Sequence, residues 1–195
     1  RFLKSTELQK KNVTELYAEL AHAPYGIKDG VAPVLFLAAI LAEDGEAALF
    51  EEGTYVPELT APIIERFRRR PQRFEAARYT IDGARIKLIE QLAELVLADP
   101  EKKPKPLTLV RELYQRATQW PSYARATQRL SPDALAVRNT LLGAKDPLRL
   151  LFIDLPQSVG LKPTLQNDTE LLFVDLAGPL RAALTEINNA YPSLL

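Results

Sequence analysis

A proline-rich segment divides the sequence into two parts. Residues 99–106 read DPEKKPKP and contain no apolar side chains other than those of the prolines. Proline cannot donate a backbone hydrogen bond and its ring clashes with the preceding helical turn, so this segment can neither continue a helix nor enter a sheet. We therefore expect a linker at 99–106 between a domain at 1–99 and a domain at 107–195.

Several helices are predicted before the linker, because apolar residues recur there at three- and four-residue spacing. They cover 6–22, 31–43, a stretch from Thr60 to Pro71, and 82–96. Ser5 or Thr6 is expected to cap the first helix and Thr60 the third, since their hydroxyl oxygens accept bonds from exposed backbone N–H groups.

Residues 31–42 form the longest apolar run of the sequence. These 12 residues are too few to cross a bilayer, which needs about 20, and Pro33 lies inside the run. We expect a helix buried in the core and no membrane-spanning segment.

Three strands are predicted in the same part, over 47–50, 54–56 and 74–81. The first two flank Glu51, Glu52 and Gly53, a sequence typical of a hairpin turn. A helix preceded and followed by strands is compatible with a winged helix. The first part is therefore predicted to be α+β, with a small three-stranded antiparallel sheet and winged-helix-like character.

The part after the linker is predicted to be an all-α bundle. Ser131 and Asp146 each precede a proline, which is typical of a helix N-cap followed by proline at the first helical position. The predicted helices cover 107–119, 132–142, 147–153 and 169–191, the last with a kink at Pro179. The fold class predicted for the whole chain is α+β and mostly helical.

Composition excludes several kinds of active site. The sequence has no cysteine and a single histidine, His22, so it offers neither thiolate chemistry nor an ordinary zinc site. None of the common phosphate-loop, dinucleotide-binding, zinc-protease or serine-hydrolase motifs occurs in it. The prediction is therefore a non-catalytic protein with no cofactor and no metal.

A cluster of five arginines is the sharpest candidate binding feature: Arg66, Arg68, Arg69, Arg70 and Arg73. Their guanidinium groups could bind the phosphates of DNA from the helix that follows the hairpin. Glu65 lies three and four residues before Arg68 and Arg69, however, and further glutamates lie nearby in the hairpin. Because Lys+Arg and Asp+Glu both number 25, no global charge adds attraction for nucleic acid, and a solvated or protein-facing patch remains the other interpretation.

In a second candidate surface, aromatic residues alternate with arginines, as they do on surfaces that bind single-stranded nucleic acid. It consists of Tyr114, Arg116, Trp120, Tyr123, Arg125 and Arg129. The alternative interpretation is that Trp120 anchors one helix against the next.

Two pairs of segments resemble part of a known group of proteins. Residues 23–35 (APYGIKDGVAPVL) and 48–59 (ALFEEGTYVPEL) are similar to a segment downstream of the nucleotide-binding domain in large bacterial P-loop ATPases, including BREX-like ones associated with phage defence. Residues 130–139 (LSPDALAVRN) and 151–156 (LFIDLP) are similar to the continuation of that segment. The phosphate-binding loop that defines such ATPases does not occur here, so the resemblance implies a non-catalytic module of a larger machine.

The leading functional expectation is a structural or interaction module of a large multidomain ATPase, located in the cytoplasm. Its partners would be other domains of a longer parent chain or other protein subunits, because the sequence starts at an arginine and is expected to be a piece of a longer protein. The alternative expectation is a winged-helix-like DNA-binding module. The sequence does not identify the partner or the oligomeric state.

Overall fold

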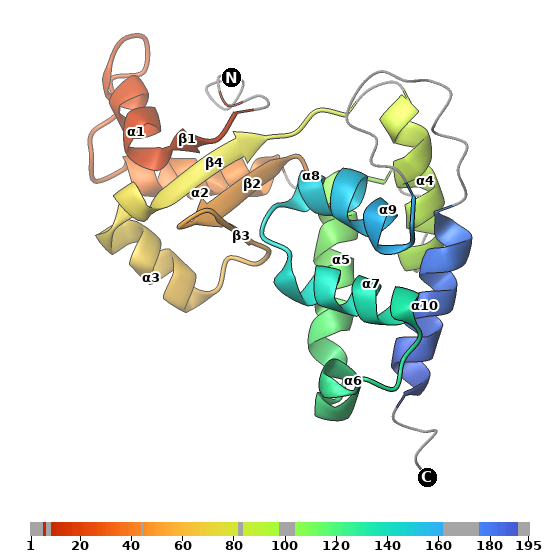
Figure 1. The fold of residues 1–195 in the computed structure, drawn as a ribbon. Helices are drawn as coiled ribbons and strands as arrows, with labels where there is room; N and C mark the ends of the chain where they lie inside the picture. The colour runs from red at the N-terminus through yellow and green to blue at the C-terminus, as the bar shows by residue number, and fades with distance from the viewer. Residues whose placement is uncertain are drawn as a thin grey trace. The chain divides into compact units, whose positions relative to one another are not determined.

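The computed structural model describes residues 6, 9–43, 45–81, 84–97, 104–161 and 176–190. They belong to two units, which divide between Thr80 and Ile81 (Figure 1). Unit 1 combines helices with an antiparallel sheet, whereas the described part of unit 2 is helical. The predicted α+β, mostly helical class is therefore confirmed.

The sheet of unit 1 has four strands among the described residues, in the order β1-β4-β2-β3. They are β1 (Lys11–Asn12), β2 (Ala47–Glu51), β3 (Thr54–Val56) and β4 (Phe74–Arg78). The predicted sheet had three strands and lacked β1. A strand of two residues is too short to show an alternating pattern, and β1 is defined only by its antiparallel pairing with Ala76 and Glu75 of β4.

The hairpin between β2 and β3 confirms the predicted turn. Glu51 pairs with Thr54, so the loop consists of Glu52 and Gly53 alone. Both loop residues have positive φ, 51° and 78°, as a type I′ turn requires. Glycine adopts this conformation without steric cost, whereas Glu52 adopts it at some cost in backbone strain.

Three helices of unit 1 pack on the sheet: α1 (Val13–Ala21), α2 (Ala32–Ala42) and α3 (Ala61–Arg69). Helix α1 starts later than predicted. Its cap is Asn12, which accepts a bond from the backbone N–H of Thr14 (2.9 Å), and not Ser5 or Thr6; Ser5 lies outside the described residues. A short 3₁₀ segment, η2 (Pro71–Arg73), joins α3 to β4.

Aromatic rings fill the core of unit 1. Phe36 of α2 stacks on Phe67 of α3 at 5.5 Å between ring centroids, and Phe67 meets Phe74 of β4 edge to face at 5.1 Å. All three rings are completely buried. Each ring comes from a different element, so the cluster fixes α2 and α3 against the sheet.

Unit 2 is built from helices that vary in length. They are α4 (Ala84–Val96), α5 (Pro106–Gln119), α6 (Ser122–Ala126), α7 (Pro132–Gly143), α8 (Pro147–Arg149), η3 (Leu150–Asp154), α9 (Leu155–Ser158) and α10 (Ala177–Asn189). Helix α5 packs on α4 and α7, and α10 packs on both α7 and α4. Among the described residues, no helix is both long enough and apolar enough to cross a membrane.

The division between the units differs from the predicted linker. Helix α4 precedes residues 99–106 in the chain, yet it packs on α5 and α10 and belongs to unit 2. Its apolar face, with Ile89, Leu92 and Val96, is buried. Prolines indicate where a helix must end, but they do not indicate which other helices an amphipathic helix packs against, and that packing decides the unit to which the helix belongs. Residues 99–103 of the predicted linker lie outside the described residues.

Two helices of unit 2 differ in detail from prediction. Residues 147–158 are helical throughout, and η3 within them is a π-helix. Pro179 lies in the first turn of α10, where the missing N–H would have no helical partner, so its position gives no reason for a kink. The predicted start of this helix, at 169–175, lies outside the described residues.

The Gly53 conformation gives a stability prediction. Gly53→Ala should lower the free energy of unfolding of unit 1 by roughly 1–2 kcal/mol, because a Cβ is strained at positive φ. Gly30→Ala is the matched control, since Gly30 does not have positive φ and a Cβ there meets nothing within 4 Å. Urea unfolding followed by circular dichroism measures both; equal stabilities would contradict the strain at Gly53.

The start of α7 gives a second prediction. Glu186 of α10 accepts bonds from the N–H and hydroxyl of Ser131, both at 2.6 Å, and these bonds lower the pKa of that carboxyl below 4.5. A lowered folded-state pKa means stability that is present above the unfolded pKa and is lost as pH falls. Glu186→Gln should therefore cost about 1 kcal/mol near pH 7 and progressively less in acid.

Urea unfolding measures this effect through the fluorescence of Trp120, the single tryptophan, which lies in unit 2. Glu90→Gln, at an exposed carboxylate of α4, is the control for a general loss of charge. A Glu186→Gln deficit that stays constant down to pH 3 would rule out the carboxylate as its cause.

Candidate interaction surface

Helix α2 exposes an apolar surface on the side away from the core. We call this the α2 outer face; it consists of Val31, just before the helix, with Val34, Leu35, Ala38, Leu41 and Ala42. Val34 and Leu41 are 67% and 63% exposed, and Val31 and Leu35 are 50% and 42% exposed. On the opposite side of the helix, Ala32, Phe36 and Ile40 are buried. A helix that is apolar all round normally has every side covered, but the described part of the chain leaves this side of α2 exposed.

The prediction of a wholly buried helix at 31–43 is therefore wrong for one side of α2. No charged residue occurs between Val31 and Ala42, so the sequence contains no polar stripe to distinguish the core side from the outer side. Hydrophobicity alone predicted burial, whereas α2 has a core on one side only. The run therefore contains no signal from which the exposed side could have been predicted.

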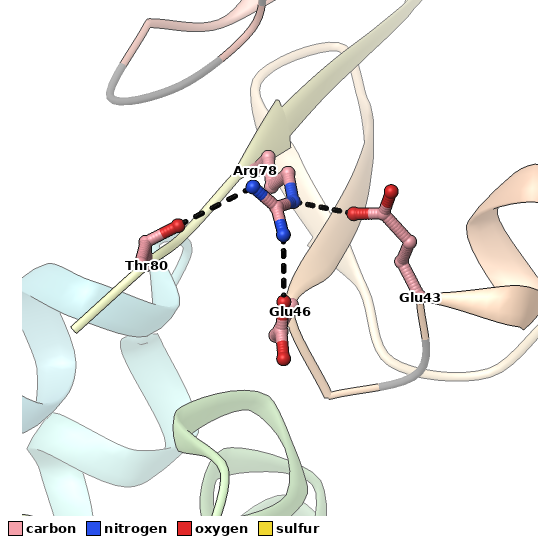
Figure 2. Close-up of polar contacts among 4 residues, drawn as sticks. All are labelled: Glu43, Glu46, Arg78 and Thr80. Atoms are coloured by element: carbon pink, nitrogen blue, oxygen red, sulfur yellow. Dashed lines mark hydrogen bonds and ion pairs between the residues drawn. The ribbon is translucent and has the colours of Figure 1, made fainter. Parts of the chain in front are cut away.

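A polar cluster ties the end of α2 to the sheet (Figure 2). The guanidinium of Arg78, on β4, donates to Glu43 just after α2 and to Glu46 just before β2, the latter at 3.0 Å. Figure 2 also shows its third contact, to the hydroxyl of Thr80 at 3.5 Å. The Arg78 side chain is only 18% exposed, so water screens these ion pairs less than it screens surface pairs.

The core side of α2 rests on a second aromatic contact. Tyr17 of α1 meets Phe36 and Phe67 edge to face, at 6.0 and 6.3 Å between ring centroids. The Tyr17 hydroxyl is buried without a hydrogen-bond partner among the described residues, and burial raises the pKa of Tyr17. Helices α1 and α3 and the Arg78 cluster therefore hold α2 in place, so its outer face lies on a fixed support.

Most of the predicted arginine cluster is engaged with glutamates. Arg66 binds Glu51 through two parallel bonds, Nε to Oε1 at 2.7 Å and Nη2 to Oε2 at 2.8 Å. Arg73 pairs with Glu52 at 3.2 Å, and Arg69 pairs with Glu65 of its own helix at 2.8 Å. The Arg66 and Arg73 pairs join α3 and η2 to the β2–β3 hairpin, whereas the Arg69 pair lies within α3.

The pairing changes which arginines could bind phosphate. The hydrogen bonds from Arg66, with the charge of Arg73 acting in the same sense, lower the pKa of Glu51, so this carboxylate stays charged and keeps its arginine occupied. Arg68 and Arg70 are exposed and form no ion pair or hydrogen bond with described residues. The contact between Glu65 and Arg69 was predicted from the sequence. The two contacts to the hairpin, from Arg66 and Arg73, could not be predicted from it.

The second predicted surface consists largely of residues with contacts inside unit 2. Trp120 is buried, and its Nε1 donates to Oδ1 of Asn188 on α10 at 2.9 Å. Tyr114 donates to the Ala144 carbonyl, and Arg125 to the carbonyls of Trp120 and Thr118. Arg116 donates to the carbonyl of Val96. Tyr123 is partly buried and Arg129 is exposed, so these aromatics do not form an open stacking surface.

The comparisons with known proteins give no match. No protein-family model matches the chain, and no curated protein or solved structure is significantly similar to it.

Proposed function

We propose that this chain is a non-catalytic interaction module of a larger cytoplasmic assembly and that its partner covers the α2 outer face. The observation that carries the proposal is the exposure of four large apolar side chains on one fixed helix: Val31, Val34, Leu35 and Leu41. A contiguous apolar surface of this kind is typical of a docking site.

Burial of this face would supply useful binding energy. Fully burying a Val or Leu side chain contributes about 1.5–3 kcal/mol, and these four side chains are roughly half exposed. Covering them would therefore contribute about 1 kcal/mol each. A total of about 4 kcal/mol changes a dissociation constant by roughly three powers of ten.

The partner surface should be an apolar helix. The outer face presents side chains at positions 31, 34, 35, 38, 41 and 42, the three- and four-residue spacing with which helices pack against each other. Charged residues occur only beyond its ends, at Lys28 and Asp29 before α2 and at Glu43 after it. The partner surface that fits the α2 outer face is therefore an uncharged helix face, because a charged partner would leave ions buried without counter-ions.

The proposal includes the kind of parent protein. The resemblance of residues 23–35 and 48–59 to a segment of large P-loop ATPases of the phage-defence type supports a partner within such a parent chain or its complex. Reading the gene upstream of Arg1 tests this point. A G-x-x-x-x-G-K-[ST] string preceding it supports the ATPase parent, and a complete upstream reading frame without one excludes it.

A crosslinking experiment tests the docking surface. A photoreactive residue at Ala38, in the middle of the α2 outer face, should give a discrete adduct with one protein or domain in cells that express the chain. The same residue at Leu142, an exposed apolar position of α7, is the control and should not give that adduct.

The adduct then defines a binding measurement with purified components. Val34→Ser with Leu41→Ser should weaken binding of the crosslinked partner at least about tenfold, because two apolar contacts are lost while the buried side of α2 is unchanged. Circular dichroism checks that the variant is folded. An adduct equal at both positions, or binding that the double variant leaves unchanged, would refute the α2 outer face as the docking surface.

DNA binding remains the alternative function, and the free Arg68 and Arg70 are the observation in its favour. With two phosphate contacts, the logarithm of the binding constant for duplex DNA should fall against the logarithm of the salt concentration with a slope of only about −1.8. We expect duplex binding weaker than about 10 µM at 0.15 M salt by fluorescence anisotropy. Tighter binding that Arg68→Gln with Arg70→Gln abolishes, and that the control Arg129→Gln retains, would make DNA binding the leading function.

A further inference from the structure

Unit 2 contains a hollow that none of the preceding arguments use. It has a volume of about 680 Å³ and lies between the C-terminal end of α7, the connection that follows, and the helical segment α8–η3–α9. These helices lie side by side in Figure 1, and α7 packs on both η3 and α9. The hollow is within the size range of small-molecule sites, and all of its lining residues belong to unit 2.

The π-helix shapes one wall of this hollow. Across η3 the backbone N–H of Leu155 bonds to the carbonyl of Leu150, five residues earlier. In an α-helix, residues five apart point about 140° away from each other, whereas a π turn brings them to the same side. Arg149 and Asp154 are five apart and form an ion pair at 3.2 Å. The π turn therefore places a guanidinium and its counter-ion together at the hollow.

A buried arginine orients a polar group on the opposite wall. Arg138 is only 3% exposed, and its Nε and Nη2 both donate to Oδ1 of Asn139, at 3.3 and 3.2 Å. Its remaining nitrogen, Nη1, donates to the carbonyls of Ala124 and Thr127. Because Oδ1 of Asn139 is held as an acceptor, the amide NH₂ of this exposed residue is left as a donor.

The groups of the hollow that remain available are mainly donors. Asp146 already accepts from the backbone N–H groups of Leu148 and Arg149, both at 3.1 Å, and Asp154 is paired with Arg149. Lys145 is exposed and forms no ion pair with described residues. The Lys145 ammonium, the Asn139 amide NH₂ and the Thr140 hydroxyl donate to no acceptor among the described residues. A ligand that binds all three must supply acceptor oxygens, and the charge of Lys145 favours negatively charged ones.

We propose that this hollow binds a small molecule through a phosphoryl group, of the size and chemistry of a sugar phosphate. A phosphoryl group offers three strong acceptor oxygens in different directions, which matches the donors of Asn139 and Thr140 on α7 and of Lys145 on the connection that follows. The volume exceeds what a bare phosphate fills, and polar side chains in the lining, such as that of Gln157, suit a hydroxyl-bearing body.

A nuclear magnetic resonance titration of the full chain tests the proposal at constant ionic strength. The probes are glucose 6-phosphate, inorganic phosphate and glucose, and the reporters are the Asn139 side-chain amide and the Gly143 backbone amide. Glucose 6-phosphate should shift both signals saturably with a dissociation constant of about 1 mM or tighter. Inorganic phosphate should bind the same residues more weakly, and glucose should shift neither.

A pair of lysine variants makes the result specific. Lys145→Gln should weaken glucose 6-phosphate binding about tenfold, because a charge-assisted hydrogen bond is lost. Lys28→Gln, at an exposed lysine of unit 1, should leave binding unchanged. The proposal is overturned if neither phosphate-bearing probe shifts the reporters, if glucose shifts them equally, or if Lys145→Gln binds as tightly as the wild-type chain.

Discussion

The guanidinium of Arg78 is the contact on which the arrangement of unit 1 depends. It binds a carboxylate at the end of α2 and another at the start of β2, and it is itself carried by β4, the central partner of β1 and β2 (Figure 2). Partly buried ion pairs of this kind are costly to break singly, because the remaining charge loses its counter-ion. The end of α2 is held there and its middle is held by Phe36, so the helix is attached at two points, and its orientation decides which of its side chains water can reach.

Local chemistry in the sequence predicts much of the fold. The Glu52-Gly53 turn, the Ser131 cap and the prolines at the starts of α7 and α8 each act within a few residues, and each is found where the sequence places it. What the sequence does not show depends on distant partners. Strand β1 exists only through its pairing with β4, and the assignment of α4 to unit 2 depends on its contacts with α5 and α10.

For the candidate sites, too, local features could be predicted from the sequence and contacts between distant residues could not. The sequence shows that five arginines lie close together, but their availability depends on Glu51 and Glu52 across the hairpin, which only the fold brings near. The same holds for Trp120. Its indole N–H donates to Asn188 on α10, which lies 68 residues away in the chain, so its surroundings could not be predicted from its own segment. The exposure of the α2 outer face could not be predicted for a different reason. Its residues are all apolar, as core residues are, and an apolar composition does not indicate how many sides of a helix are buried.

The π turn at Leu150–Asp154 makes the wall of the unit 2 hollow depend on chain length as well as on side-chain identity. An uninterrupted α-helix of the same length would point Asp154 about 140° away from Arg149. Removing one residue between them would leave the two side chains four positions apart, and in an α-helix residues four apart lie on the same face. The ion pair therefore depends on the match between the number of residues in the segment and the kind of turn that they form, which no substitution of a single side chain alters.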